Sequence, residues 1–445
     1  MSDYRSDEAY SQQLAARLVE FVHPLLERLD KQVDKRLVRT FLLTLQAIIT
    51  FRHSQYGLLL SELGAYVLSP GQAPAGTKRV SNLLRSKKWK AQEIETYLWE
   101  QADARLTAHQ DEDKPPLVVW DESVVEKAET LASEDLGAVR SRRAALLKRV
   151  RPGFFFNPPG GRPVLVPGME WLTLLLLLPE LPPLVATMRW WTTRGPHASC
   201  RQDEQEALLE HCVGLWGRRV IHVWDRGFAS RLWLEQVLRH KVRFILRWPK
   251  RYNLLNAQGL KVNAWKVTRG KRSMDSRLIW DARRRCWRKT GLIFAPVRHP
   301  AHEAPLWLVV ARPGKGREPW YLLTNEPLAT VEDAWRIVLA YARRWQVEMT
   351  YRYAKTELAI QSPRLWFWHN RLKFMMMVAL VYAFLLSLIL PDAIPLRETL
   401  LRRWCHRTGK RYRTAAIPLY RLRSALSRLW LAYPPDPLRL WETPG

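Results

Sequence analysis

The sequence predicts an α/β protein with a helical region at its N-terminus and a β-rich insertion in its second half. Apolar residues recur at helical spacing over residues 1–110, and short strands rich in β-branched residues alternate with helices from about residue 111. Residues 249–320 then alternate basic, aromatic and apolar residues as strands do. The predicted regions are a helical region over 1–110, a core over 111–248 and 321–392, the insertion over 249–320 and a basic C-terminal tail over 393–445.

The charge of the chain points to a polyanionic partner. Lys and Arg number 71 against 42 acidic residues in 445 residues, which gives a formal net charge of +29. Such a chain repels itself unless a polyanion is near, so nucleic acid is the first candidate and an anionic membrane surface is the rival. We favour nucleic acid because the basic residues are spread along the chain and do not form one amphipathic helix.

A basic stretch at 77–90 closes the predicted N-terminal helices. It carries Lys78, Arg79, Lys87 and Lys88 and follows a loop-like segment rich in Pro and Gly. Cations on one helix suit contact with DNA phosphates, and a solvated surface helix is the alternative interpretation. On the first interpretation, residues 1–110 form a DNA-binding region.

Two predicted strands end alike, in Val118-Val-Trp-Asp121 and His222-Val-Trp-Asp225. An Asp that closes a buried strand lies at the edge of the sheet, where the sites of α/β proteins form. If the two strands are parallel neighbours, the carboxylates of Asp121 and Asp225 lie side by side and repel each other. A divalent cation would relieve that repulsion. Taken alone, each Asp could instead form a turn or cap a helix.

The predicted insertion combines cations with tryptophan. Arg283, Arg284, Arg285 and Arg288 lie among several Trp residues. Basic residues interleaved with aromatic rings suit phosphate contact and base stacking. The alternative is a small β-domain whose Trp residues form its own core.

Residues 331–362 contain no Gly or Pro and predict one long helix. At about 100° per residue, Tyr341, Arg344, Glu348 and Lys355 fall within a stripe of about 60° on that helix. A polar stripe is often a solvated face. Here, however, a carboxylate surrounded by cations could serve a metal site beside the phosphates of DNA.

The helix pattern Tyr341-x2-Arg344-x3-Glu348-x6-Lys355 resembles the Y-R-E-K motif of insertion-sequence-four-type DDE transposases, a bacterial family. The order of Trp120-Asp121, then Asp225-Arg226, a β-rich insertion and the Glu helix is similar to the same family. The resemblance covers roughly residues 40–390. One departure is that Gly227-Phe-Ala follows Asp225-Arg226, where some relatives have Glu-Ala-Asp.

This resemblance implies a ribonuclease H-like core, with a mixed sheet and flanking helices, that holds two Mg2+ ions, with Mn2+ able to replace them. Asp121 would bridge both ions, and Asp225 and Glu348 would each hold one. The implied activity is a DNA transposase that cleaves the ends of a mobile element and joins them to target DNA, in this family typically through a hairpin intermediate.

The resemblance also implies DNA contacts. Tyr341, Arg344 and Lys355 would hold phosphates near the cut end, and Arg226 is counted with them. Trp320 leads a segment that resembles the one whose Trp stacks on a flipped base in related enzymes, although it could simply begin a core strand. The expected partners are the terminal inverted repeats and the target DNA. A homodimer on DNA is expected because two ends must be brought together.

Other classes of function find little support. The four Cys residues and the His residues lack the spacing of zinc ligands, and Gly314-Lys-Gly-Arg lacks the Ser or Thr of a phosphate-binding loop. No nucleotide cofactor is therefore expected. The apolar run 374–390 lies at the short limit of a spanning helix, so we expect a buried core helix and no membrane partner. The polar N-terminus and the Cys usage fit a reducing cytosol. Together with the resemblance to a bacterial family, they lead us to expect a bacterial cytoplasmic protein associated with the nucleoid.

Two alternatives to an active transposase remain open from the sequence. A transposase-derived DNA-binding protein that no longer cuts DNA would bind DNA tightly and tolerate loss of Asp121. A stand-alone nuclease with the same core would cleave without joining strands and without needing specific ends.

Overall fold

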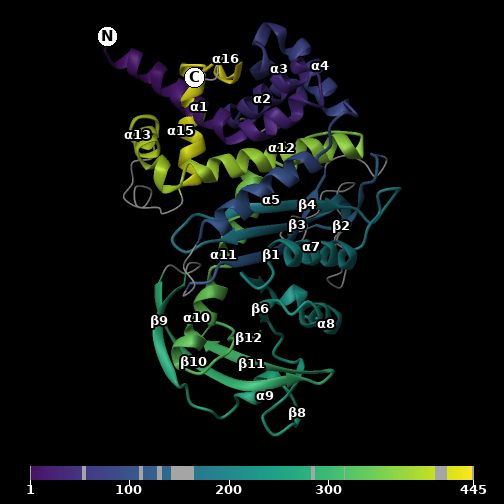
Figure 1. Ribbon diagram of the computed structural model, residues 1–445, viewed down its shortest axis with the longest axis vertical. Helices are drawn as coiled ribbons and strands as arrows, with labels where there is room; N and C mark the ends of the chain where they lie inside the picture. The colour runs from purple at the N-terminus through teal and green to yellow at the C-terminus, as the bar shows by residue number, and fades with distance from the viewer. Residues whose placement is uncertain are drawn as a thin grey trace.

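The computed structural model describes residues 2–52, 57–109, 114–127, 133–141, 165–281, 286–314, 316–405 and 418–442. Arg283, Arg284 and Arg285 of the insertion lie outside the described residues, as does much of the basic C-terminal stretch. The chain forms helical layers above a large mixed sheet, and the strands of the insertion extend that sheet at its far end (Figure 1). The predicted α/β class is confirmed.

Helices from both ends of the chain pack together at the top of the molecule (Figure 1). The C-terminal helix α15 contacts α2, and α16 contacts α1. The C-terminal helices thus share a layer with the N-terminal ones. The elements of this layer are α1 (Ser2–Asp30), α2 (Lys35–Thr50), α3 (Leu60–Val67), η1 (Pro70–Gln72), α4 (Ala73–Arg85), α5 (Gln92–Thr107), η3 (Pro391–Ala393), α13 (Ile394–Trp404), α15 (Leu419–Ala432) and α16 (Pro437–Glu442).

The described strands form one sheet in the order β2-β3-β1-β5-β6-β12-β11-β10-β7-β8, with β4 paired to β3 and β9 paired to β10. Strands β1, β5 and β6 are parallel, and the strands on either side of this trio are antiparallel to it. Their bounds are β1 (Leu117–Glu126), β2 (Gly137–Arg140), β3 (Leu165–Leu177), β4 (Leu184–Trp191), β5 (Ile221–Trp224), β6 (Arg243–Arg247), β7 (Asn253–Leu255), β8 (Lys261–Asn263), β9 (Asp275–Asp281), β10 (Cys286–His299), β11 (His302–Arg312) and β12 (Trp320–Thr324).

The central strands are buried on both faces, as parallel strands covered by helices are. Val119 and Val223 belong to the core shared with the N-terminal helices and α12 (Trp368–Ser387). Trp120 and Trp224 point into the opposite core, which lies under α7 (Arg201–Trp216) and α8 (Arg231–Arg239). The alternation along each strand therefore builds two hydrophobic layers around the sheet.

Two elements near the predicted site differ from the sequence expectation. Strand β1 does not end at Asp121 but continues to Glu126, because Ser123, Val124 and Val125 keep pairing with β3. The predicted helix 331–362 is two helices, α10 (Val331–Ala342) and α11 (Trp345–Thr356). They are separated by a tight turn in which Arg344 N–H donates to the carbonyl of Tyr341 over 3.0 Å. The four motif residues therefore do not lie on one continuous helix.

Helix α12 contains the apolar run noted in the sequence. By length and composition it is the one helix among the described residues that could cross a membrane, and 78% of its apolar window is buried inside the protein. It lies between α2 and the sheet, next to α5 (Figure 1), and contacts α2, α5 and β4. These contacts agree with the expectation of a core helix.

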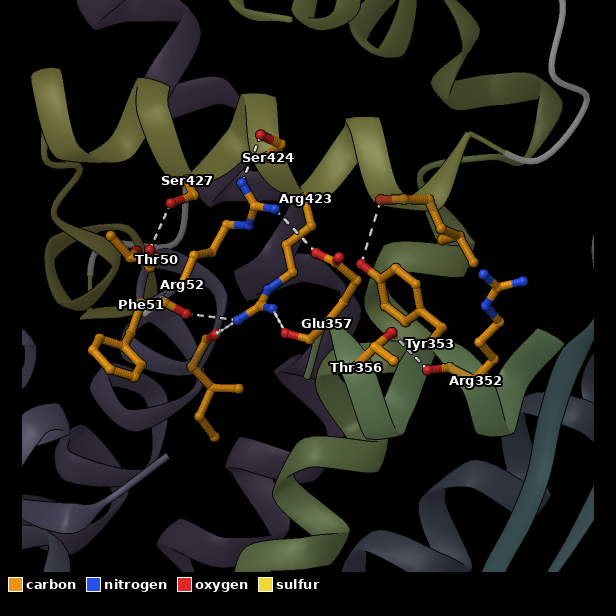
Figure 2. A network of polar contacts seen from close by, with 12 residues as sticks. Thr50, Phe51, Arg52, Arg352, Tyr353, Thr356, Glu357, Arg423, Ser424 and Ser427 are labelled. Carbon is orange, nitrogen blue, oxygen red and sulfur yellow. Dashed lines mark hydrogen bonds and ion pairs between the residues drawn. The ribbon is translucent and has the colours of Figure 1, made fainter. Parts of the chain in front are cut away.

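A buried arginine joins α11 to the helical layer (Figure 2). The Arg423 side chain, from α15, donates to the carbonyls of Ile48 and Phe51 at the end of α2, each over 2.7 Å, and to the carbonyl of Glu357 just after α11. Glu357 in turn pairs with Arg52 at 3.0 Å. A single guanidinium thus caps the C-terminal ends of two helices, where unpaired carbonyls would otherwise be buried.

Candidate active site

Asp121 and Asp225 lie at the same level on neighbouring parallel strands. The register pairs Val119 with Val223, and each Asp is two residues further along the chain. Asp225 follows β5 directly, as the sequence predicts, and its Oδ1 accepts a hydrogen bond from Gly227 N at 2.7 Å. It therefore also caps the short helix η2 (Arg226–Phe228), the structural role that the sequence left open.

Glu348 approaches the two aspartates from α11. Arg344, the residue just before that helix, contacts Asp121 and Glu348. Its Nη1 lies 3.3 Å from Asp121 Oδ2, and its Nη2 is hydrogen-bonded to Glu348. The side chain of Asp121 is 14% exposed and that of Glu348 is 39% exposed. The guanidinium thus bridges a buried carboxylate on the sheet and a more open one on the helix.

The carboxylates act on one another electrostatically. Burial raises the pKa of Asp121 to about 7, the Arg344 charge opposes this, and the charges of Asp225 and Glu348 raise the pKa further. The three predicted acids therefore belong to one electrostatic cluster, which holds more negative charge than Arg344 alone neutralises. Perturbed carboxyls of this kind are typical of functional sites.

The backbone of Asp121 is fixed from α11 by a residue that the sequence analysis missed. The Tyr351 hydroxyl donates to the carbonyl of Asp121, and its ring packs edge-on against Trp171 at 4.6 Å. Lys355, one turn further along α11, donates to Ser123 Oγ at 2.7 Å. Tyr351 lies three residues after Glu348, and this spacing on a helix could have identified it.

The two Trp residues that precede the aspartates face the opposite layer. Trp120 Nε1–H donates to His222 Nδ1 at 3.0 Å, and the His222 ring stacks on Trp224 at 5.3 Å. Burial lowers the pKa of His222 to about 3. Because Nδ1 accepts the bond from Trp120, the proton of the neutral ring is on Nε2. This neutral aromatic layer supports the strands that carry the aspartates.

A cavity of about 470 Å³ opens beside Glu348, between the insertion and helices α10 and α11. Trp280, Trp320 and Trp345 line it, together with Arg247 and Arg317. Trp320 begins β12, the strand position that the sequence left open, and its ring meets Tyr341 edge-on at 5.1 Å. The sequence analysis did not single out Trp345, which follows Arg344 directly.

Tyr341 and Arg226 take positions that the sequence could not specify. Tyr341 is only 3% exposed, and burial raises its pKa. Arg226 lies 3.6 Å from Glu318, which Lys250 also contacts at 3.0 Å. In this arrangement Tyr341 supports Trp320, and Arg226 belongs to a charged group at the edge of the cavity.

The predicted N-terminal DNA contacts lie apart from the carboxylates. Lys78 and Arg79 are exposed on α4, and Lys87 and Lys88 are exposed just after it. Helix α4 packs against α2 and α3 in the helical layer, whereas Asp121 lies on strand β1 of the sheet and Asp225 directly follows strand β5. These four cations are therefore not brought into the carboxylate cluster.

The donors around the cluster fit a hard divalent cation in their chemistry. Mg2+ prefers carboxylate oxygens, and Asp121, Asp225 and Glu348 supply them from three different elements. Within the described ranges, no three Asp, Glu, His or Cys side chains stand close enough to hold an ion as they are arranged. The guanidinium of Arg344 lies between Asp121 and Glu348 and contacts both.

Comparison with known proteins adds to this geometry. Residues 204–384 match the family model described as "Transposase DDE domain". Among solved structures, the chain is similar to a piggyBac transposase synaptic complex with hairpin DNA, with a TM-score of 0.41 and 13% identity over 93% of this chain and 78% of that chain. No curated protein matches the chain. The segment that supplies Asp225 and Glu348 is therefore similar to a transposase DDE domain.

Proposed function

We propose that this chain is a DNA transposase whose three carboxylates form one metal-dependent site for cutting and joining DNA. The observation that carries the proposal is the convergence of Asp121, Asp225 and Glu348, whose charges act on one another. The match of residues 204–384 to the transposase DDE family supports it. The net charge of +29 suits a partner with a phosphate backbone.

In this proposal Asp121, Asp225 and Glu348 hold two Mg2+ ions, which Mn2+ can replace. The bound ions supply activation of the attacking oxygen and stabilisation of the leaving oxygen. Before DNA binds, the positive charge of Arg344 offsets part of the negative charge of Asp121 and Glu348, which its guanidinium contacts. When DNA binds, the same guanidinium contacts a phosphate. Lys355 supports strand β1 through Ser123 and adds positive charge beside the site.

The cavity beside Glu348 suits the DNA end. Arg247 and Arg317 offer charge to phosphates, and Trp320 offers an aromatic face to a displaced base. Water attacks a phosphodiester at the element's end, which breaks the bond from phosphorus to the 3′-oxygen and leaves a 3′-hydroxyl and a 5′-phosphate. The 3′-hydroxyl then attacks a phosphodiester of the opposite strand, where it forms a new ester bond and displaces that strand's 3′-oxygen as a hydroxyl. We propose cut-and-paste transposition through a hairpin, by a homodimer that holds two element ends. Lys78, Arg79, Lys87 and Lys88 would bind DNA away from the cutting site.

A cleavage assay tests the proposal. The purified chain is incubated with Mg2+ and labelled DNA that carries both ends of its own element, beside Asp225→Ala, Glu348→Ala and Glu303→Ala. Glu303 is an exposed carboxylate on β11 and serves as the matched control. We expect the wild type and Glu303→Ala to cut and join DNA, and the other two variants to bind DNA without cutting it.

A DNA-binding protein without cleavage activity is the competing function. It predicts salt-sensitive DNA binding and no cleavage by any form, with either Mg2+ or Mn2+. That outcome would overturn the transposase proposal. Cleavage of any DNA without strand joining would instead favour a stand-alone nuclease.

A further inference from the structure

The β9–β10 ribbon of the insertion has one strongly exposed apolar face. Leu278 is 66% exposed, Trp280 48% and Trp287 64%. Trp280 and Trp287 are directly opposite each other across the two strands, with ring centroids 5.6 Å apart in an edge-to-face arrangement. Large aromatic side chains are seldom left this open, so an exposed pair of them indicates a binding surface.

The opposite face of the same ribbon is firmly attached to α10. Asp275 accepts a hydrogen bond from Trp335 Nε1 at 2.7 Å, and the Arg277 guanidinium lies over the Trp335 ring at 5.1 Å. Ile279 packs against the main core. The ribbon is therefore held in place from one side, and its Trp pair faces outward from a fixed support.

The Trp pair lies at the end of the ribbon that reaches the candidate active site. Trp280 is one residue before the end of β9 at Asp281, and Trp287 is one residue after the start of β10 at Cys286, so both lie at the same end of the ribbon. Trp280 also lines the cavity that Glu348 borders. DNA held at the carboxylates would therefore pass next to this pair.

The surroundings of the pair favour DNA over a protein partner. Lys289 is exposed on the same face, directly opposite Leu278, and Arg247, Arg317 and, from the other face of the ribbon, Arg288 line the cavity that Trp280 borders. Cations beside open aromatic rings provide contacts for phosphates and for the faces of bases. A ribbon of two strands is also narrow enough to enter the major groove of DNA.

We propose that Trp280 and Trp287 form a stacking surface for bases of the DNA bound at the carboxylate site, separate from the contact predicted for Trp320. This inference rests on the proposed function for the position of the DNA. The rings contact bases that are unstacked or lie at the end of a duplex, because only these expose a face. The contact is tolerant of sequence, since every base presents such a face.

The test is a binding measurement made without cleavage. Fluorescence anisotropy in Ca2+ compares the wild type, Trp280→Ala/Trp287→Ala and Trp280→Phe/Trp287→Phe on a duplex that carries one element end. Trp366→Ala, at a residue that is 56% exposed outside the ribbon, is the matched control. We expect the Ala pair to weaken binding by about tenfold or more, and the Phe pair and Trp366→Ala to stay within about threefold of the wild type.

A second readout separates base stacking from general loss of affinity. 2-Aminopurine placed at successive positions near the element end should be quenched by the wild type at one or two positions and lose that quenching in the Ala pair. Far-UV circular dichroism and thermal unfolding establish that the variants are folded. Unchanged affinity and unchanged quenching in a folded Ala pair would overturn the inference.

The outcomes also separate this inference from the proposed function. If the wild type cleaves DNA and the Ala pair binds as well as the wild type, the inference fails while the function stands. If no form cleaves DNA but the Ala pair loses affinity and quenching, the function fails while the stacking surface stands. A change in oligomeric state of the Ala pair in light scattering without DNA would assign the surface to a second copy of the chain and overturn the inference.

Discussion

The molecule uses tryptophan in two opposite ways on the two sides of its candidate active site. Trp120 and Trp224 are fully buried behind the aspartates and contact each other at 5.8 Å. Trp280 and Trp287 form a pair of nearly the same separation, 5.6 Å, but are about half exposed on the insertion. The first pair supports the carboxylates from within, and the second faces whatever occupies the site.

This contrast shows that a ring contact alone does not reveal the role of an aromatic residue. The buried pair also holds His222, which accepts a hydrogen bond from Trp120 and stacks on Trp224. The exposed pair has cations near it and no covering element among the described residues. The buried pair should therefore determine stability, and the exposed pair should determine binding.

The largest expected effect comes from emptying the buried layer. Trp224→Ala removes a ring that contacts His222 and Trp233, both at 5.3 Å, and leaves a large cavity beneath Asp225. The free energy of unfolding should fall by about 3–5 kcal/mol, as measured by urea denaturation. Trp366→Ala, at an exposed position, is the control. A loss below about 1 kcal/mol for Trp224→Ala would break the proposed distinction.

A smaller effect is expected when only the hydrogen bond is removed. Trp120→Phe keeps most of the ring but leaves His222 Nδ1 buried without its donor. The free energy of unfolding should fall by about 1–3 kcal/mol. Combining Trp120→Phe with His222→Leu tests the cause, because the double variant should then lose less than the sum of the two single losses. Strict additivity would show that the hydrogen bond is not responsible.

The buried imidazole should also give the protein a pH dependence. Burial lowers the pKa of His222 from its ordinary 6.5 to about 3, so between these values the unfolded chain takes up a proton that the folded protein does not. Stability is therefore lost as pH falls below about 6.5, by up to about 1.4 kcal/mol per pH unit. His222→Gln should flatten this slope between pH 6.5 and 5. An unchanged slope in His222→Gln would contradict the account.

The smallest expected effect on stability is at the exposed pair. Trp287→Ala removes one cross-strand ring contact from a side chain that is 64% exposed. The free energy of unfolding should change by about 1 kcal/mol or less. Thermal unfolding of Trp287→Ala and Trp224→Ala, measured side by side, compares the two losses of stability. A loss at Trp287 as large as that at Trp224 would mean that the exposed pair is part of the fold's support.

Much of the site could be predicted because its residues follow strands and helices with clear patterns. The repeated Val-Trp-Asp endings predicted that Asp121 and Asp225 would lie side by side if their strands were parallel neighbours, and β1 and β5 are parallel neighbours. The spacing from Arg344 to Glu348 is one helical turn, and the two side chains do contact each other. These are local signals that do not depend on distant parts of the chain.

What could not be predicted depends on tertiary contacts. Strand β1 continues beyond Asp121 because residues 122–126 pair with β3. No local sequence pattern predicts that pairing. The helix that the sequence favours over 331–362 is interrupted after Ala342, and the Arg344 side chain at this break contacts Asp121 on the sheet. The insertion was expected as a separate β-region, yet β12 pairs with both β6 and β11 and joins it to the central sheet.

The measurement that tests the central claim most directly asks whether Asp121 acts with Glu348, because Asp121 lies outside the segment that matches the transposase family. Cleavage rates are measured for Asp121→Asn, Glu348→Gln and the double variant, with DNA binding followed separately. One shared site predicts that each single variant loses roughly 10³-fold or more in rate and that the double variant loses no more than either single variant. Cleavage by Asp121→Asn at close to the wild-type rate would contradict the account.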